Sequence, residues 1–228
     1  MKKLLFILLL FCSFQVFGQI EGFWRFNGNL TNSVSGTNAT GSGTIIYKAS
    51  LNNSGVEFAK NSWANCGNIA NYTSSDFTIS FLMYIKAYSI TDVNSLVLFT
   101  KGNGPYNSFG FYCDVTKDGI GFNTAKSGST QSSSTRGTNT IDLNKWYYIT
   151  IVRTGASVRI FQNGVDKTVS AGTHQNPAAT AQSFYINVYN STSPYYSGNV
   201  LFDDFKISPK KWNNAEIKNE FARLKGFF

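Results

Sequence analysis

The stretch NKWYYITIVRTGASVRIFQNGV, residues 144–165, decides the fold class of this chain. Apolar and polar side chains alternate through two runs that meet at Thr154-Gly155, and a period of two is typical of β-strands. Asn163-Gly164 follows, a pair that favours a two-residue hairpin turn because both residues adopt a positive φ at little cost. Both faces of the first run carry large side chains, which predicts a strand in the middle of a sheet: Trp146, Tyr148, Thr150 and Val152 on one face, and Tyr147, Ile149 and Ile151 on the other.

The same alternation recurs along most of the chain. In DFTISFLMYI, residues 76–85, one face carries Phe77, Ile79, Phe81, Met83 and Ile85, and the half-polar second face predicts cover on both sides. The pattern predicts strands at 20–26, 44–48, 56–58, 77–85, 96–101, 109–115, 119–124, 146–153, 157–162, 183–189 and 200–208. Gly, Asn and Ser cluster between these runs, as turns require. We therefore expect an all-β fold, an antiparallel two-sheet β-sandwich or jelly roll.

A short C-terminal helix is predicted from NNAEIKNEFARL, residues 213–224. Asn213 and Glu216 have the spacing of a capping box, in which each residue satisfies a backbone amide of the first turn. Ile217, Phe221 and Leu224 recur at helical spacing and predict the face that packs on the sheets. By contrast, the Ser/Thr-rich stretch 125–140 has no apolar period and is predicted to be a mobile loop.

The N-terminal residues 1–18 have the features of a signal peptide. Lys2 and Lys3 precede an apolar run at 4–11, and Val16 and Gly18 stand at −3 and −1 of a cleavage site before Gln19. An uncleaved anchor and lipidation at Cys12 are alternatives, but a large Phe precedes that cysteine where a lipobox has a small residue. We expect an exported protein, secreted, periplasmic or on the cell surface, with one domain at 19–228 and no membrane span after cleavage.

The formal net charge is +8, with Lys and Arg scattered along the chain. This excess favours anionic partners such as acidic polysaccharide, or simply solubility, and the lack of a basic stripe argues against nucleic acid. Two cysteines follow the predicted signal, Cys66 and Cys113. They could form a disulfide in an oxidising compartment or remain as buried free thiols, since Cys113 shares strand parity with inward-facing Phe111.

The acidic residues and the lone histidine argue against catalysis. Glycoside hydrolysis needs two carboxylates facing each other across the scissile bond, and no pair on one strand has that spacing. Glu216 and Glu220 are four residues apart on the predicted helix, where we expect solvated charges. His174 lies in SAGTHQNP, without a nearby Cys or acid that would suggest a metal site or a catalytic pair. The sequence therefore predicts a protein that is not an enzyme.

Exposed aromatic rings beside amide groups indicate carbohydrate binding, because rings pack on sugar faces and amides bind hydroxyls. SFYINVYN, residues 183–190, predicts Phe184, Ile186 and Val188 facing inward and Tyr185, Asn187 and Tyr189 facing outward. The next loop adds Tyr195 and Tyr196, and Tyr112 and Asn123 are expected on the same sheet. The alternative is that these tyrosines only cover the sheet.

Four segments in order resemble the laminin-G-like branch of the concanavalin A-like lectin/glucanase jelly rolls, common in exported bacterial proteins. They are GFWRFNGNLTNSVSGTNATGSG at 22–43, DFTISFLMYI at 76–85 with Leu82 where the family usually has Trp, KWYYITIVRTGASVRIFQNGV at 145–165, and VLFDDFKISPKKWNNAEIKNEF at 200–221. The resemblance implies a non-catalytic module that binds carbohydrate at a cell surface or outside the cell. Its alternatives are a structural or adhesive protein–protein module and, third, a divergent glycan-cleaving enzyme.

The resemblance also implies a structural calcium ion near the last of these segments. Asp203 shares strand parity with Leu201, Phe205 and Ile207, which predicts a carboxylate on the core side that needs a cation or several hydrogen bonds. Asp203 or Asp204 would hold calcium together with oxygens of the 26–36 loop: Asn27, Asn29 and Asn32. The family often has Asp where this chain has Asn32, which lowers the ligand charge. The alternative is that Asp203 pairs with Arg25 or caps backbone amides.

Overall fold

The computed structural model describes residues 20–34, 37–70, 76–88, 95–102, 110–125, 132–137, 140–176, 180–189 and 196–225. The predicted signal peptide lies outside these ranges, so it stays a prediction. No helix among the described residues has the length and apolar character that a membrane crossing demands.

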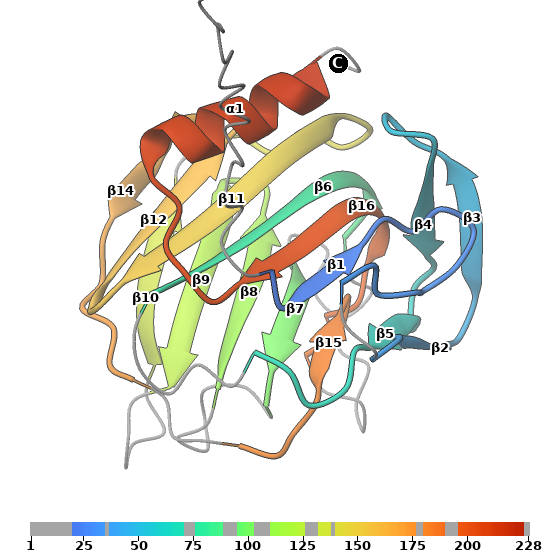
Figure 1. The fold of residues 1–228 in the computed structure, drawn as a ribbon, viewed down its shortest axis with the longest axis horizontal. Helices are drawn as coiled ribbons and strands as arrows, with labels where there is room; N and C mark the ends of the chain where they lie inside the picture. The colour runs from blue at the N-terminus through green and yellow to red at the C-terminus, as the bar shows by residue number, and fades with distance from the viewer. Residues whose placement is uncertain are drawn as a thin grey trace, which may run out of the picture.

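Two antiparallel eight-stranded sheets form a sandwich (Figure 1), which confirms the predicted fold class. Sheet A runs in the order β13 (Val165–Asp166), β12 (Ser157–Gln162), β11 (Trp146–Thr154), β6 (Phe77–Ala87), β16 (Asn199–Ser208), β4 (Ser54–Phe58) and β3 (Ile45–Ala49), and β1 (Gly22–Trp24) pairs with β16. Sheet B runs in the order β14 (Thr168–Ser170), β10 (Ser132–Gly137), β9 (Gly119–Ala125), β8 (Phe111–Thr116), β7 (Ser95–Lys101), β15 (Phe184–Ile186), β5 (Trp63–Asn65) and β2 (Thr40–Ser42). The helix α1 (Asn214–Lys225) follows the last strand.

The hairpin at 144–165 has the predicted place and geometry. β11 lies between β12 and β6, away from both edges of sheet A. The backbone at Asn163 and Gly164 has φ of 50° and 75°, as a hairpin turn with two left-handed residues requires. The Asn163 side chain also accepts a hydrogen bond from the backbone N–H of Tyr148 at 2.9 Å, which fixes the turn against β11.

The core lies between the sheets and consists largely of stacked and edge-to-face phenylalanines. Phe81 of sheet A stacks on Phe205 with ring centroids 5.2 Å apart, and Phe99 of sheet B stacks on Phe184 at 5.5 Å. Such aromatic pairs add packing energy to the area that they bury. The predicted inward face of β6 is confirmed, because its five apolar residues belong to this core: Phe77, Ile79, Phe81, Met83 and Ile85.

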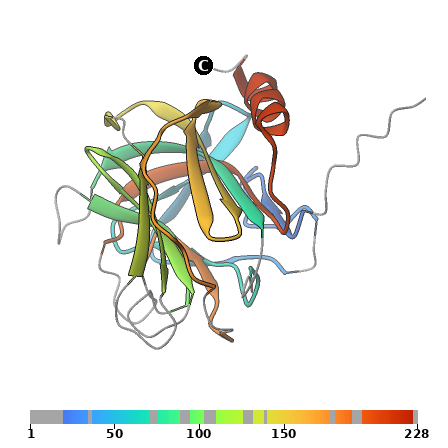
Figure 2. The same ribbon diagram turned by 90° about the vertical axis from the view of Figure 1, so that its left-hand side faces the viewer.

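The helix α1 covers part of the outer face of sheet A, over β6, β11 and β12 (Figures 1 and 2). Leu224 packs with Leu82 and Tyr148, and Ile217 packs with Val152 and Phe161, which confirms the predicted apolar stripe of the helix. The capping box is also present. Asn213 Oδ1 accepts hydrogen bonds from the N–H groups of residues 215 and 216, and the Glu216 carboxylate accepts one from the Asn213 N–H at 2.7 Å.

Two details differ from the sequence-based expectations. Part of the predicted loop 125–140 is strand β10, which pairs with β9 and β14; residues 126–131 and 138–139 lie outside the described ranges. Cys66 and Cys113 are buried free thiols, so the disulfide alternative is wrong. Cys113 lies on β8 and Cys66 follows β5, three strand spacings away in sheet B. At about 4.8 Å per spacing, their Cα atoms lie beyond the 7 Å or so that a disulfide allows.

Candidate binding face on sheet B

The outer face of sheet B carries a group of tyrosines, Tyr112, Tyr189 and Tyr196, which we call the tyrosine cluster. Tyr112 projects from β8 on the side opposite to Phe111 and Cys113, both of which belong to the core. Its ring meets that of Tyr189 edge to face with centroids 5.4 Å apart, and the Tyr189 ring meets that of Tyr196 at 6.2 Å. Tyr196 is 40% exposed, so the cluster presents an aromatic surface to solvent.

A polar network lies beside the tyrosine cluster on the same face. Ser134 Oγ donates to Asn123 Oδ1 at 2.7 Å, and Asn123 Nδ2 donates to Asp114 Oδ1 at 2.6 Å. Arg136 Nη1 donates to the other carboxylate oxygen of Asp114 at 2.5 Å. The network thus joins β8, β9 and β10 through the residues that alternate with the core positions, and its Arg136 end is accessible to ligands because that side chain is 42% exposed.

Gly121 makes room for this network. It is the Cα partner of both Asp114 and Arg136, and it lies between them on the sheet. A Cβ at this position would lie 2.0 Å from Arg136 Nη1 and 2.6 Å from Asp114 Oδ1, far inside van der Waals contact. Ser134, Asp114 and Arg136 were not predicted as ligand residues from the sequence. The parity of Asp114 with Tyr112 was a usable signal, whereas Ser134 and Arg136 were hidden in the predicted loop.

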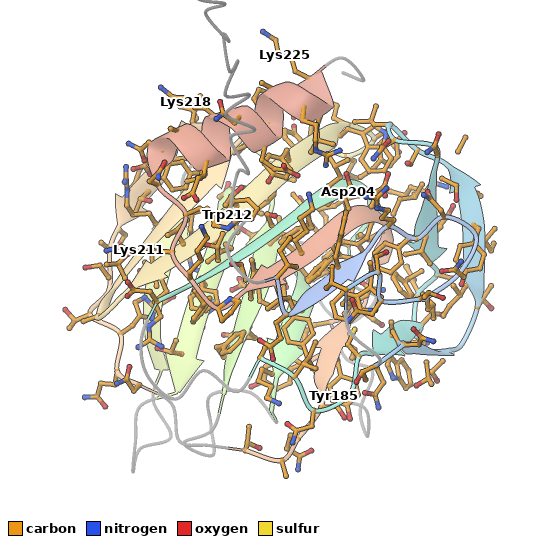
Figure 3. The ribbon with its side chains drawn as sticks, in the orientation of Figure 1. Tyr185, Asp204, Lys211, Trp212, Lys218 and Lys225 are labelled. Atoms are coloured by element: carbon orange, nitrogen blue, oxygen red, sulfur yellow. The ribbon has the colours of Figure 1, made fainter. Side chains whose placement is uncertain are left out.

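The remaining predicted ligand residues have different positions. Asn123 lies in the network and is 2% exposed. Its amide therefore positions Asp114 and is not accessible to donate to a sugar hydroxyl. Tyr185 is on the outer face, in register with Thr100 and Asn65, and is only 7% exposed (Figure 3). Tyr195 lies outside the described residues.

The expectation that Asn187 faces outward with the tyrosines is wrong. Asn187 is fully buried, and its backbone has a φ of +66°, which ends the regular alternation after β15. Its amide Nδ2 donates to the carbonyl oxygens of Ser62 and Gly198 at 2.9 and 3.0 Å, and its Oδ1 accepts from the Gly198 N–H. Asn187 therefore connects three segments of backbone and is not available to a ligand.

The predicted orientation of Asp203 is also wrong, although the residue is buried as expected. The register of β16 against β6 shifts between Asp203 and Lys206, and Asp204 adopts a φ of +45°. This β-bulge reverses the alternation, so that Phe202 and Phe205 both enter the core. Asp203 pairs in register with Leu82, whose side chain lies under α1 on the outer face of sheet A.

The carboxylates of Asp203 and Asp204 both accept hydrogen bonds from other groups of the protein. Asp203 accepts hydrogen bonds from Ser50 Oγ and from the Asp204 N–H. Asp204 accepts from Asn52 Nδ2 at 3.1 Å and from Arg223 of α1 at 2.7 Å. Burial raises the pKa of Asp203 to about 7, and the neighbouring Asp204 charge adds to this effect.

The asparagines expected to complete a calcium site have roles within their own loop. Asn32 Oδ1 accepts from the backbone N–H groups of Phe23 and Val34, and Asn29 Oδ1 accepts from that of Thr31. Asn27 is exposed. No group of three or more His, Cys, Asp or Glu residues that could hold a metal occurs among the described residues. The residues present therefore do not form the predicted ligand set, and calcium binding stays a prediction.

Charged residues link α1 to sheet A. Lys206 and Glu220 form an ion pair in which the side chains are only 8% and 11% exposed, so the expectation of a solvated Glu220 is wrong. Arg223 donates to Glu220 at 2.9 Å and also contacts Asp204. Burial by itself would raise the pKa of Glu220, but Arg223 and Lys206 outweigh burial and hold it below its ordinary value. The Lys206–Glu220 pair is thus a buried ion pair that links α1 to β16 of sheet A.

His174 is likewise a structural residue. It is 2% exposed, and its two ring nitrogens lie 2.8 and 2.7 Å from the hydroxyls of Thr124 and Thr135. Burial lowers the pKa of His174 to about 4, and the nearby Arg153 charge lowers it further. The neutral imidazole can donate to one threonine and accept from the other, which explains how the sandwich holds it in its interior.

A family model described as the concanavalin A-like lectin/glucanases superfamily, Laminin_G_3, matches residues 58–218. The chain belongs to this superfamily. The resemblance inferred from the four sequence segments is thereby confirmed, and the superfamily's jelly roll is the sandwich seen here. A search of curated proteins finds no match to this sequence.

Solved structures with this superfamily's fold include several binding domains. Domain 4 of AbnA, an extracellular GH43 arabinanase from Geobacillus stearothermophilus solved with arabinotriose, matches with a TM-score of 0.63 and 15% identity, over 88% of this chain and 97% of that one. The binding domain of Paraclostridial Mosquitocidal Protein 1 matches with a TM-score of 0.72 and 13% identity, over 89% and 51%. The binding domain of botulinum neurotoxin DC in complex with rat synaptotagmin II matches with 0.66 and 14%, over 89% and 51%. The chain spans about half the length of these toxin domains, and at such identities the likeness concerns the fold.

Proposed function

We propose that this protein is a non-catalytic module that binds carbohydrate on the outer face of sheet B, outside the cytoplasm. The observation that carries the proposal is the tyrosine cluster beside the Ser134–Asn123–Asp114–Arg136 network. Aromatic rings cover the apolar faces of sugars, and a guanidinium held in place by a carboxylate donates to hydroxyls. The predicted signal peptide supports the location, and the arabinotriose complex of the arabinanase domain supports the ligand class.

The charged groups on this face support binding without catalysis. Asp114 is the only acidic residue in the eight strands of sheet B, among the described parts of the chain. Hydrolysis of a glycosidic bond needs two carboxylates about 5–10 Å apart. Both oxygens of Asp114 already accept hydrogen bonds from Asn123 and Arg136. The described face therefore offers a carboxylate that orients a donor but no acid–base pair.

A glycan array with matched tyrosine variants tests the proposal. Tyr196→Ala and Tyr112→Ala should each weaken binding about tenfold, because each removes ring contact with the sugar. Tyr47→Ala is the control, since Tyr47 is 38% exposed but lies on the edge strand of sheet A. Binding that survives both cluster variants, or that is lost equally in the control, would remove the tyrosine cluster from the site.

Gly121→Ala tests the polar network without removing a functional group. The new methyl group has to displace the Arg136 side chain from Asp114, given the 2.0 Å approach to Nη1. We expect glycan binding to weaken about tenfold while the tyrosines stay in place. An unchanged affinity, with an unchanged melting temperature, would show that Arg136 and Asp114 take no part in binding.

Protein binding is the second candidate function. Among the described strands β3 lies at the edge of sheet A, and it exposes Ile46 at 42% and Tyr47 at 38%. Edge strands with apolar side chains are common sites of strand addition. The botulinum neurotoxin domain, which has the same fold, was solved with a protein receptor. An array without glycan hits, together with protein binding that Ile46→Lys abolishes, would favour this candidate.

A further inference from the structure

The charges of the two sheets are distributed unequally. The strands of sheet A carry nine charged residues, which include Glu57 in ion pairs with Lys48 and Lys86. Another of the nine, Lys206, pairs with Glu220 of α1. The strands of sheet B carry three: Lys101, Asp114 and Arg136. Lys101 is 1% exposed and pairs in register with Phe111 and Phe184, so its side chain points inward. The outer face of sheet B therefore has one cation and one anion from its strands.

These two charges neutralise each other. The Arg136 guanidinium lies 2.5 Å from the Asp114 carboxylate, whose side chain is only 12% exposed. An anionic ligand that approaches Arg136 would also approach Asp114, so the net Coulomb attraction is small. A hydroxyl group is uncharged, so Asp114 does not repel it. It can accept a hydrogen bond from an N–H group of Arg136 that does not contact Asp114.

Three exposed lysines lie on another part of the molecule. Lys218 and Lys225 point away from the sheets on the far side of α1, and Lys211 lies just before the helix (Figure 3). These lysines are on the side of the molecule covered by α1, opposite to sheet B. They can attract polyanions to that side, but such attraction is weak at the salt concentrations of most environments because exposed charges are screened.

Resting on the function proposed above, we propose that the ligand is an uncharged, hydroxyl-rich polysaccharide, and not an acidic one. The tyrosine cluster supplies the contact area. Arg136 supplies directional hydrogen-bond donors, and Asp114 neutralises its charge. Affinity then depends on ring contact and hydrogen bonds, which salt changes little, whereas recognition of a uronate or sulfate polymer would weaken steeply with salt.

Affinity electrophoresis with soluble polysaccharides tests this choice. The neutral probes are arabinan and a β-glucan, and the acidic probes are polygalacturonate and dextran sulfate. Lys218→Ala and Lys225→Ala are combined as the background for every measurement, so that attraction to the α1 side is reduced. We expect retention by at least one neutral probe, with less than about a twofold change between 0.05 and 0.5 M NaCl. Tyr112→Ala should weaken that retention about tenfold.

Two other results would overturn the inference in distinguishable ways. Retention by an acidic probe alone, lost at about 0.5 M NaCl and abolished by Arg136→Ala, would keep carbohydrate binding on sheet B but make the ligand anionic. No retention by any probe, together with an empty glycan array, would overturn the proposed function itself. The Tyr47→Ala variant in the same background serves as the control for loss of an exposed tyrosine.

Discussion

Glu220→Gln is the variant that most directly tests how α1 is held on sheet A. The substitution keeps the shape of the side chain and removes its charge. Lys206, which is 8% exposed, then loses its closest carboxylate while remaining beneath the helix. Burial lowers the pKa of Lys206, and the Glu220 charge is the largest influence that opposes this shift. The variant therefore leaves a buried ammonium without its main partner.

The expected loss follows from the burial of this pair. Removing one partner of a buried ion pair costs about 3–5 kcal/mol, and the lower end applies because the glutamine oxygen still accepts a hydrogen bond and Asp204 stays near. For a chain of this size, each kcal/mol shifts Tm by about 2–4 °C. We therefore expect Tm to fall by about 6–12 °C in thermal unfolding followed by circular dichroism.

Two further variants separate pairing from a general effect of lost charge. Asp118→Asn makes the same chemical change at a pair that is 66% and 78% exposed, so it should alter stability by less than about 0.5 kcal/mol. The double variant Lys206→Met, Glu220→Gln removes the buried ammonium that has lost its carboxylate partner, and it should recover most of the lost stability. If Glu220→Gln costs no more than Asp118→Asn, the pair does not fasten α1 to the sheet.

Other predictions concern buried titratable groups and the calcium site. The folded pKa of Asp203 is about 7 against an ordinary 3.8, so its contribution to stability falls by up to about 4 kcal/mol as pH rises through that window. The folded pKa of His174 is about 4 against an ordinary 6.5, so its contribution to stability increases as pH rises between these values. Asp203→Asn should therefore make the stability rise more steeply from pH 4 to 7, as measured by urea unfolding; a slope equal to the wild type's would contradict this assignment. Cys66 and Cys113 should resist a thiol reagent until the protein unfolds, and Tm should be the same with and without reductant; a lower Tm in reductant would indicate a disulfide. A Tm that rises with calcium and falls with EDTA would support the calcium prediction, and an unchanged Tm would contradict it.

The sequence predicted the regular parts of the fold because local patterns determine them. The turn at Asn163-Gly164 needs two left-handed residues, and both residue types adopt that conformation readily. The capping box of α1 depends on two side chains three residues apart. The inward face of β6 follows from simple alternation, which holds for every residue from Phe77 to Ile85 because that stretch has no bulge.

Alternation failed where the backbone departs from a regular strand. Asp204 and Asn187 both adopt a positive φ. At Asp204 the departure moves the neighbouring side chains to the opposite face, and at Asn187 it leaves the side chain bonded to the backbone of Ser62 and Gly198. Asn and Asp are the non-glycine residues that tolerate this conformation best, but nothing local distinguishes these two from others in the chain. A β-bulge arises from how β16 pairs with β6 and β4, which is a non-local property.

The binding face was predicted in part for the same reason. Tyr112, Tyr189 and Tyr196 come together as expected, since they lie on or beside strands of sheet B. Arg136 could not be found, because SSSTRG lacks the apolar alternation that marks a strand. It forms a strand because β9 and β14 supply hydrogen-bonding partners on both sides. A polar strand of this kind becomes recognisable only after the sheet is assembled.

The position of α1 explains why sheet B, and not sheet A, carries the candidate binding face. The outer face of sheet A contains two buried charged residues, Asp204 and Lys206. Burial of these charges destabilises the fold unless groups of opposite charge lie against them. Arg223 and Glu220 of α1 provide those charges, while Ile217 and Leu224 cover the apolar residues between them. The part of sheet A beneath α1 is therefore committed to packing within the chain. Sheet B satisfies the polar side chains of its outer face through the Ser134–Asn123–Asp114–Arg136 network, so it needs no covering helix there and the tyrosine cluster remains accessible to a ligand.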